Sequence, residues 1–310
     1  MIQHTYLFPG QGSQKLGMGK ELFGKYPQFM KQADGILGYS IEELCLNGTQ
    51  EQLNQTQYTQ PALYTVEALS YLSRCEITGE KPDYIAGHSL GEFAALFAAN
   101  VYDFDEGLYL VAKRGELMAQ ATGGGMAAVI GLTLSQVTDV IARNRLKEIE
   151  IANLNSETQI IIAGPCDSIV KTEEVFRREK DLIKYVPLKV SGAFHSSYMQ
   201  KARDQFYQVL AGISFRTPKI KVISNCFADF YEPGRIRDTL AEQMTNPVRW
   251  YESIQMLLDK NSDMNFIEIG PGKVLTFLAR QIKKEKQERD FRKSRSLGAT
   301  SSDISSEIKV

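Results

Sequence analysis

Gly87-His88-Ser89-Leu90-Gly91 is the stretch of sequence that decides the expected fold. Its G-x-S-x-G pattern is typical of a nucleophile elbow, in which a serine lies on a sharp turn between a strand and a helix. The preceding residues 82–86 are short and partly apolar, like a buried strand, and residues 92–99 are apolar and alanine-rich, like a helix. The sequence therefore predicts a strand, a turn that projects the Ser89 hydroxyl, and a helix whose free N–H groups face it.

Strand-like and helix-like segments alternate along residues 1–122, which predicts an α/β domain with a parallel sheet. Gly123, Gly124 and Gly125 are hard to place inside one element, so we interpret them as a domain crossing. Residues 123–190 then follow the order β-α-β-β-α-β, the split pattern of ferredoxin-like folds. We expect an inserted ferredoxin-like subdomain at 123–190, and a large α/β-hydrolase-like catalytic domain made of 1–122 and 191–282. A first helix is expected from about Lys20, and further helices span about 61–73, 92–99, 106–121, 134–143, 167–178, 198–210 and 273–282.

The character of the chain changes at residue 283. Residues 283–295 hold seven Lys or Arg against three acidic residues, and residues 296–310 hold five serines and little apolar material. We interpret 283–310 as a tail or an interdomain linker rather than core.

Composition excludes several classes of function. The 310 residues are 43% hydrophobic and 24% charged, with 36 basic against 37 acidic residues, so general nucleic-acid binding is not expected. The four cysteines form no C-x-x-C pair, which argues against a metal site or a disulfide framework. No secretion signal or membrane span is evident, and we expect a cytoplasmic protein that does not bind membranes.

A serine nucleophile needs a base, and the chain offers three histidines. His4 precedes the first strand, and His88 adjoins Ser89 inside the turn, so His195 is the candidate by elimination. A nucleophile that precedes its histidine is the chain order of α/β-hydrolase sites. Asp229 and Glu268 are candidates to orient the imidazole on position alone, and a backbone carbonyl is the alternative.

Residues 8–14, Phe-Pro-Gly-Gln-Gly-Ser-Gln, form a Gly-rich loop after the first strand. A dinucleotide-binding G-x-G-x-x-G fails because Lys15 occupies the third glycine position. We predict instead that the loop brings a backbone N–H to an oxyanion, paired with the N–H of Leu90; a plain turn is the alternative. Arg114 lies on an expected helix, where the sequence alone leaves a solvated or a functional role open.

Together these stretches resemble the malonyl-CoA:acyl-carrier-protein transacylase family, and most closely the free-standing acyltransferases that serve polyketide synthases in trans. The resemblance extends over about residues 4–282. It rests on Phe8–Gln14, Gly87–Glu92, Lys113–Met118, Asn153–Asn155, Ala193–Ser196, Asn246–Val248 with Trp250, and Glu268–Lys273.

The resemblance implies that Ser89 is the nucleophile and His195 its base. It implies that Gln11 and Leu90 supply the oxyanion N–H groups, and that the main-chain carbonyl of Gln243 orients the histidine. A carbonyl in that role would account for the absence of a clear acidic partner.

The resemblance also implies substrate contacts. Arg114 would bind the free carboxylate of a malonyl group, for which a planar guanidinium fork is suited. Asn155 would lie near the substrate. Residues 193–196 and Leu90 look like the malonyl-selective pattern of the family.

The implied activity is transfer of malonyl from malonyl-CoA to the thiol of an acyl carrier protein by a monomer that needs no cofactor and no metal. A hydrolase that clears acyl thioesters with the same Ser–His pair is one alternative, and a non-catalytic scaffold that docks carrier proteins is another. The related hydrolases lack the arginine, so Arg114 argues for transfer.

Overall fold

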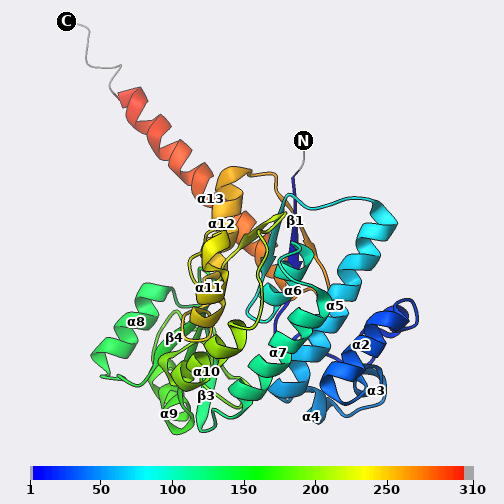
Figure 1. Cartoon of the computed structure of the whole chain (residues 1–310). Coiled ribbons are helices and arrows are strands. Elements are labelled where there is room, and N and C mark those ends of the chain that lie inside the picture. The colour runs from blue at the N-terminus through cyan, green and yellow to red at the C-terminus, as the bar shows by residue number, and fades with distance from the viewer. Residues whose placement is uncertain (1–2, 304–310) are drawn as a thin grey trace, which may run out of the picture.

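The computed structural model describes residues 3–303 and contains two β-sheets, each with its own layers of helices (Figure 1). The larger sheet has the strand order β7-β2-β1-β8 and is parallel throughout. Its strands are β1 (His4–Phe8), β2 (Tyr84–Gly87), β7 (Lys221–Ile223) and β8 (Asn265–Glu268). The predicted α/β architecture with a parallel sheet is therefore confirmed.

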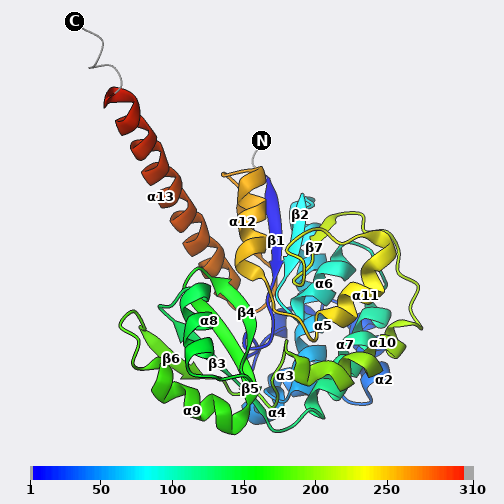
Figure 2. The same ribbon diagram turned by 90° about the vertical axis from the view of Figure 1, so that its left-hand side faces the viewer.

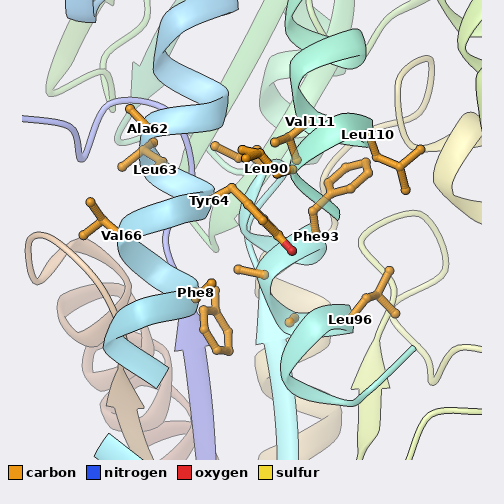
Figure 3. Packing of buried hydrophobic residues seen from close by; sticks show 14 of the residues in the cluster. Phe8, Ala62, Leu63, Tyr64, Val66, Leu90, Phe93, Leu96, Leu110 and Val111 are labelled. Atoms are coloured by element: carbon orange, nitrogen blue, oxygen red, sulfur yellow. The ribbon is translucent and has the colours of Figure 1, made fainter. Parts of the chain in front are cut away.

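Alternating side chains of β1 fill two separate cores, because successive strand residues point to opposite faces of a sheet. Tyr6 and Phe8 pack on the face covered by α5 (Thr56–Thr78), α6 (Gly91–Ala98) and α7 (Phe104–Ala119). Figure 3 shows Phe8 and Tyr64 in this layer, together with Leu90 and Phe93 from the elbow and α6. Leu7 points to the other face, where α12 (Trp250–Lys260) and α13 (Val274–Asp303) pack.

The smaller sheet is antiparallel, with the strand order β4-β5-β3-β6. Helices α8 and α9 cover its outer face around Ala127 and Val129, and Met126 and Ala128 on the inner face join the core of the larger domain (Figure 2). The elements are β3 (Gly124–Ile130), α8 (Leu134–Arg143), β4 (Glu150–Ser156), β5 (Gln159–Pro165), α9 (Cys166–Phe176) and β6 (Lys184–Pro187).

The remaining helices lie on the larger domain. They are α1 (Lys20–Phe23), α2 (Pro27–Leu37), α3 (Ile41–Leu46), α4 (Gln50–Leu53), α10 (Gln200–Leu210), preceded by the 3₁₀ turn η1 (Ser197–Met199), and α11 (Ile236–Glu242), preceded by η2 (Pro233–Arg235). The helix predicted from about Lys20 is present as the short α1, whereas α2, α3, α4, α11 and α12 were not predicted.

The interpretation of the three glycines was wrong for two of them. Gly124 and Gly125 are the first residues of β3, and only Gly123 has a positive φ, of 82°. A Cβ on Gly124 would lie 2.2 Å from the Ala193 nitrogen. The glycine therefore lets β3 begin directly against the segment that carries His195.

Two predicted helix limits were also too short. Helix α5 begins at Thr56, with Pro61 inside it, and α13 continues past residue 282 to Asp303. The segment expected to be a tail from residue 283 is therefore helical as far as the structure describes it, and Figure 1 shows it extending away from the body. Its first turns touch the large domain, since Lys283 Nζ donates to the Met264 carbonyl and Arg289 Nη1 donates to the Tyr251 hydroxyl. Residues 304–310 of the expected tail lie outside the described residues.

Candidate active site

The turn around Ser89 is tight because glycines flank it. A Cβ on Gly87 would lie 2.1 Å from the Gly91 carbonyl carbon, and a Cβ on Gly91 would lie 2.0 Å from the Phe8 carbonyl oxygen. Ser89 itself has a φ of 53°, a left-handed conformation that non-glycine residues rarely adopt. Such strained residues cluster at functional sites, where the surrounding structure holds them in place.

Asn225 holds this turn from a distant part of the chain. Its Oδ1 accepts a hydrogen bond from the Ser89 N–H at 2.6 Å, and its Nδ2 donates to the Gly87 carbonyl at 2.6 Å. The loop after β7 thus braces the elbow on both sides of the serine.

The structure brings Ser89 and His195 together. The Ser89 Oγ lies 2.7 Å from His195 Nε2, and His195 Nδ1 lies 2.8 Å from the main-chain oxygen of Gln243. Because a carbonyl only accepts, Nδ1 carries the proton and Nε2 is free to accept from the serine hydroxyl. The imidazole is buried. Burial and the positive charge of Arg114 lower the pKa of His195 to about 3, so the ring is neutral at physiological pH.

Neither acidic candidate reaches the imidazole. Asp229 accepts a hydrogen bond from the Phe230 N–H at 2.7 Å, and Glu268 accepts from the N–H groups of Leu275 and Thr276 at the start of α13. Both carboxylates therefore accept hydrogen bonds from backbone N–H groups, and the group that orients the imidazole is the main-chain carbonyl of Gln243.

Arg114 is 1% exposed and lies on the buried side of α7. Its Nη1 donates to Gln60 Oε1 at 2.8 Å, and its Nη2 donates to Gln243 Oε1 at 2.8 Å and to Ser89 Oγ at 3.3 Å. The guanidinium also stacks 5.4 Å from the centre of the Phe93 ring. Burial lowers the pKa of Arg114 to about 10, which still leaves the side chain charged at neutral pH.

The loop after β1 and the residue after Ser89 both face the same cavity. Gln11 and Leu90 line it, and within residues 3–303 neither of their main-chain N–H groups donates a hydrogen bond. A Cβ on Gly10 would lie 2.4 Å from the His88 carbonyl oxygen, so a glycine is needed for the loop to approach the elbow. Main-chain N–H groups without a partner are the kind of donor that an oxyanion needs, and both residues line the cavity that holds Ser89.

The cavity has a volume of about 290 Å³ and lies between the two sheets. Asn155, on β4 of the smaller sheet, lines it, and its Oδ1 lies 2.9 Å from His88 Nε2. The side chain of His88 thus points to the smaller sheet and away from the serine hydroxyl. Apolar side chains complete the wall: Met118, Met126, Ile161, Leu188 and Phe194.

Sequence reasoning did not find three residues of this site. Gln60 holds the guanidinium, Asn225 braces the elbow, and Glu92 is fully buried one turn after Ser89. Glu92 is part of the stretch quoted for the family resemblance, but no local pattern distinguishes a buried carboxylate from an exposed one at the start of a helix.

A serine hydroxyl bonded to a neutral imidazole, which a main-chain carbonyl holds in one tautomer, is the arrangement of enzymes that form an acyl-serine. Residues 5–306 match the family model described as acyl transferase domain. The chain belongs to this acyl transferase family.

Named relatives are similar over most of the chain. The polyketide biosynthesis malonyl CoA-acyl carrier protein transacylase BaeC of Bacillus velezensis is 52% identical over 91% of this chain and 97% of its own length. The polyketide biosynthesis protein PksE of Bacillus subtilis is 54% identical over 91% of this chain, which spans only 36% of PksE. The crystal structure of malonyl CoA-acyl carrier protein transacylase from Burkholderia pseudomallei superimposes with a TM-score of 0.89 at 44% identity, covering 92% of this chain and 99% of that one.

Proposed function

We propose that this chain is an acyltransferase that moves a malonyl group from malonyl-CoA to the phosphopantetheine thiol of an acyl carrier protein, in the service of polyketide synthesis. The observation that carries this function is the buried guanidinium of Arg114, 3.3 Å from the Ser89 hydroxyl and inside the same cavity. A fixed positive charge beside the nucleophile selects an acyl group that ends in a carboxylate. The similarity to BaeC supports both the reaction and the polyketide role.

On this proposal the reaction has two halves. His195 Nε2 takes the proton of Ser89 while Oγ attacks the malonyl thioester, and the Gln11 and Leu90 amides receive the oxyanion. The tetrahedral intermediate collapses, the C–S bond breaks, and the imidazolium returns its proton to the departing coenzyme A thiolate. Malonyl-Ser89 remains.

The second half reverses these roles with a different thiol. The carrier-protein thiol loses its proton to His195 and attacks malonyl-Ser89, and the imidazolium protonates Ser89 as the thioester forms. The main-chain oxygen of Gln243 keeps the imidazole in one tautomer through both halves. Asn155 faces the substrate from the smaller sheet and is held by His88.

This scheme uses no metal and no cofactor, since the chain supplies the nucleophile, the base and the donors. Coenzyme A thioester enters as a substrate. We propose that a monomer is active, because Ser89 already lies within hydrogen-bond distance of both His195 and Arg114 of the same chain. We also propose a cytoplasmic location, which the four free cysteines support. No helix in residues 3–303 is long and apolar enough to cross a membrane.

We also propose the finer fold description. The larger part, 1–122 and 191–282, is α/β-hydrolase-like, and the insertion 123–190 is a ferredoxin-like subdomain. The order β4-β5-β3-β6 with two helices on one face supports the second assignment.

Product analysis with and without an acceptor tests the function. The protein is incubated with radiolabelled malonyl-CoA, alone and with a phosphopantetheinylated carrier protein, and the label is followed. We expect label on the carrier protein and little free malonate when no acceptor is present. Rapid release of malonate without acceptor would favour the thioester hydrolase, and the absence of any covalent label would favour the docking scaffold.

A further inference from the structure

Glu92 is a fully buried carboxylate that the scheme above leaves without a role. It lies in the first turn of α6, and three donors from distant parts of the chain point at it. Oε1 accepts from the Tyr231 hydroxyl at 2.6 Å and from the Asn225 N–H at 3.2 Å, and Oε2 accepts from Gln243 Nε2. Two of these three donors belong to residues that also contact the candidate active site.

The side-chain amide of Gln243 lies between Glu92 and Arg114. Its Nε2 donates to Glu92 and, at 2.8 Å, to the Ser89 carbonyl, while its Oε1 accepts from Arg114 Nη2 at 2.8 Å. Because an amide carries donors on one side and an acceptor on the other, its orientation decides whether Arg114 meets an acceptor or a donor.

We propose that Glu92 is a positioning residue, which fixes the orientation of the Gln243 amide and thereby holds the Arg114 guanidinium where it recognises the carboxylate of the acyl group. The inference rests on the proposed function and adds to it the residue that sets its acyl-group selectivity. Glu92 acts through Gln243 and touches no substrate.

The chemistry of the three donors explains why a carboxylate is required at this position. An ionised carboxylate, the form of Glu92 above its raised pKa of about 7, only accepts, so it satisfies the Tyr231, Asn225 and Gln243 donors together. A glutamine at position 92 brings two N–H donors of its own. If those face Gln243, the amide of Gln243 must rotate, which turns its Nε2 toward Arg114 and removes its bond to the Ser89 carbonyl. If they face Asn225, two N–H groups oppose each other in a buried site.

The charges around Glu92 fit this role. Burial raises the pKa of Glu92 to about 7, against the bonds from Tyr231 and Gln243 and the positive charge of Arg114, which favour the ionised form; the carboxylate is therefore ionised above about pH 7, where the acylation assays are run. Gln243 separates the carboxylate from the guanidinium, so the arginine is oriented by an amide instead of being neutralised by a direct ion pair. The fork of Arg114 therefore stays available for a substrate anion.

The test compares acylation of the protein by malonyl-CoA and by acetyl-CoA, which lacks the carboxylate. The ratio of the two kcat/KM values isolates carboxylate recognition, because changes in the reactivity of Ser89 affect both substrates. We expect Glu92→Gln to lower this ratio roughly 10-fold, the value of about one hydrogen bond to a charged group. Tyr231→Phe is the matched control. It removes a bond from the same carboxylate on the side away from Gln243, and we expect an unchanged ratio.

A double-mutant cycle tests the route through Gln243. Gln243→Ala removes the amide and keeps the main-chain carbonyl on His195, so we expect a similar loss in the ratio. In that background Glu92→Gln should have no further effect, since the two residues act as one unit. Losses that multiply in the double variant would overturn the proposed route, and an unchanged ratio in Glu92→Gln would overturn the role of Glu92.

Two further outcomes are informative. If Glu92→Gln does not fold, as judged by its circular dichroism, Gln243→Ala alone decides, and an unchanged ratio in it contradicts the inference. A wild-type protein that is acylated without preference for malonyl would overturn the proposed function, and the inference with it. If wild type prefers malonyl-CoA and both Glu92→Gln and Gln243→Ala keep that preference, the inference is overturned and the proposed function stands.

Discussion

Replacing Arg114 by alanine is expected to remove most of the preference for malonyl over acetyl groups. The guanidinium is buried, and after its bonds to Gln60 and Gln243 three N–H groups remain: the Nε–H, which has no partner among residues 3–303, one on Nη1, and the one on Nη2 that points to Ser89. Two of these N–H groups can donate to the two oxygens of a carboxylate. A hydrogen bond to a charged group contributes about 1.5–3 kcal/mol, so two give about 3–6 kcal/mol, which corresponds to roughly 10²- to 10⁴-fold in kcat/KM.

The assay is the initial rate of covalent labelling at several concentrations of malonyl-CoA and acetyl-CoA, read as kcat/KM for each. Arg114→Lys keeps the charge but offers no planar fork, and we expect a ratio between those of wild type and Arg114→Ala. Lys113→Ala is the control. It removes a neighbouring positive charge that pairs with Glu116 at 2.8 Å on the exposed side of the same helix, and the ratio should not change.

The reasoning is refuted if Arg114→Ala lowers acylation by malonyl-CoA and by acetyl-CoA to the same extent. Such a result would mean that the guanidinium supports the fold of the site or the reactivity of Ser89, and that another group binds the carboxylate.

Three further predictions follow from the geometry. His195→Ala should slow acylation by roughly 10²–10⁴-fold in rapid-quench experiments, whereas His4→Ala, outside the cavity, should not; equal rates would exclude His195 as the base. The rate at which acetyl-CoA acylates the protein should stay nearly constant between about pH 8 and about pH 5. A histidine whose pKa is lowered to about 3 is neutral over this whole range and stops acting as a base only when it is protonated at lower pH. A rate that falls to half near the ordinary pKa of histidine would contradict this. Gly91→Ala should lower the melting temperature strongly, since its Cβ would lie 2.0 Å from the Phe8 oxygen. Gly35→Ala on helix α2 is the control, because no atom lies within 4 Å of its Cβ. Similar melting temperatures of the two variants would show that the elbow does not need a glycine at position 91.

Local sequence patterns were sufficient for the elbow and for the pairing of Ser89 with His195. A G-x-S-x-G turn specifies its own strand and helix, and three histidines left few choices for a base. Gly124 shows the limit of this reasoning. A run of glycines indicates a break in most chains, but here Gly124 opens a strand because Ala193 passes too close for a side chain.

The rest of the site depends on contacts between residues far apart in the chain. No sequence pattern around Gln243 indicates that its main-chain oxygen orients a histidine, so only the family resemblance predicted this role. Glu92 looks like an ordinary acidic residue in the first turn of a helix, where the helix dipole favours a negative charge. Its burial follows from Asn225, Tyr231 and Gln243, each more than 130 positions away.

The central claim is that Ser89 carries the acyl group between the two thiols. Intact-mass spectrometry of the protein after brief mixing with malonyl-CoA tests it most directly, with Ser89→Ala treated in parallel. The account predicts that wild type gains the mass of one malonyl group, that a phosphopantetheinylated carrier protein removes it, and that Ser89→Ala gains nothing. A malonyl adduct on the alanine variant, or a wild-type adduct located by peptide mapping at another residue, would contradict it.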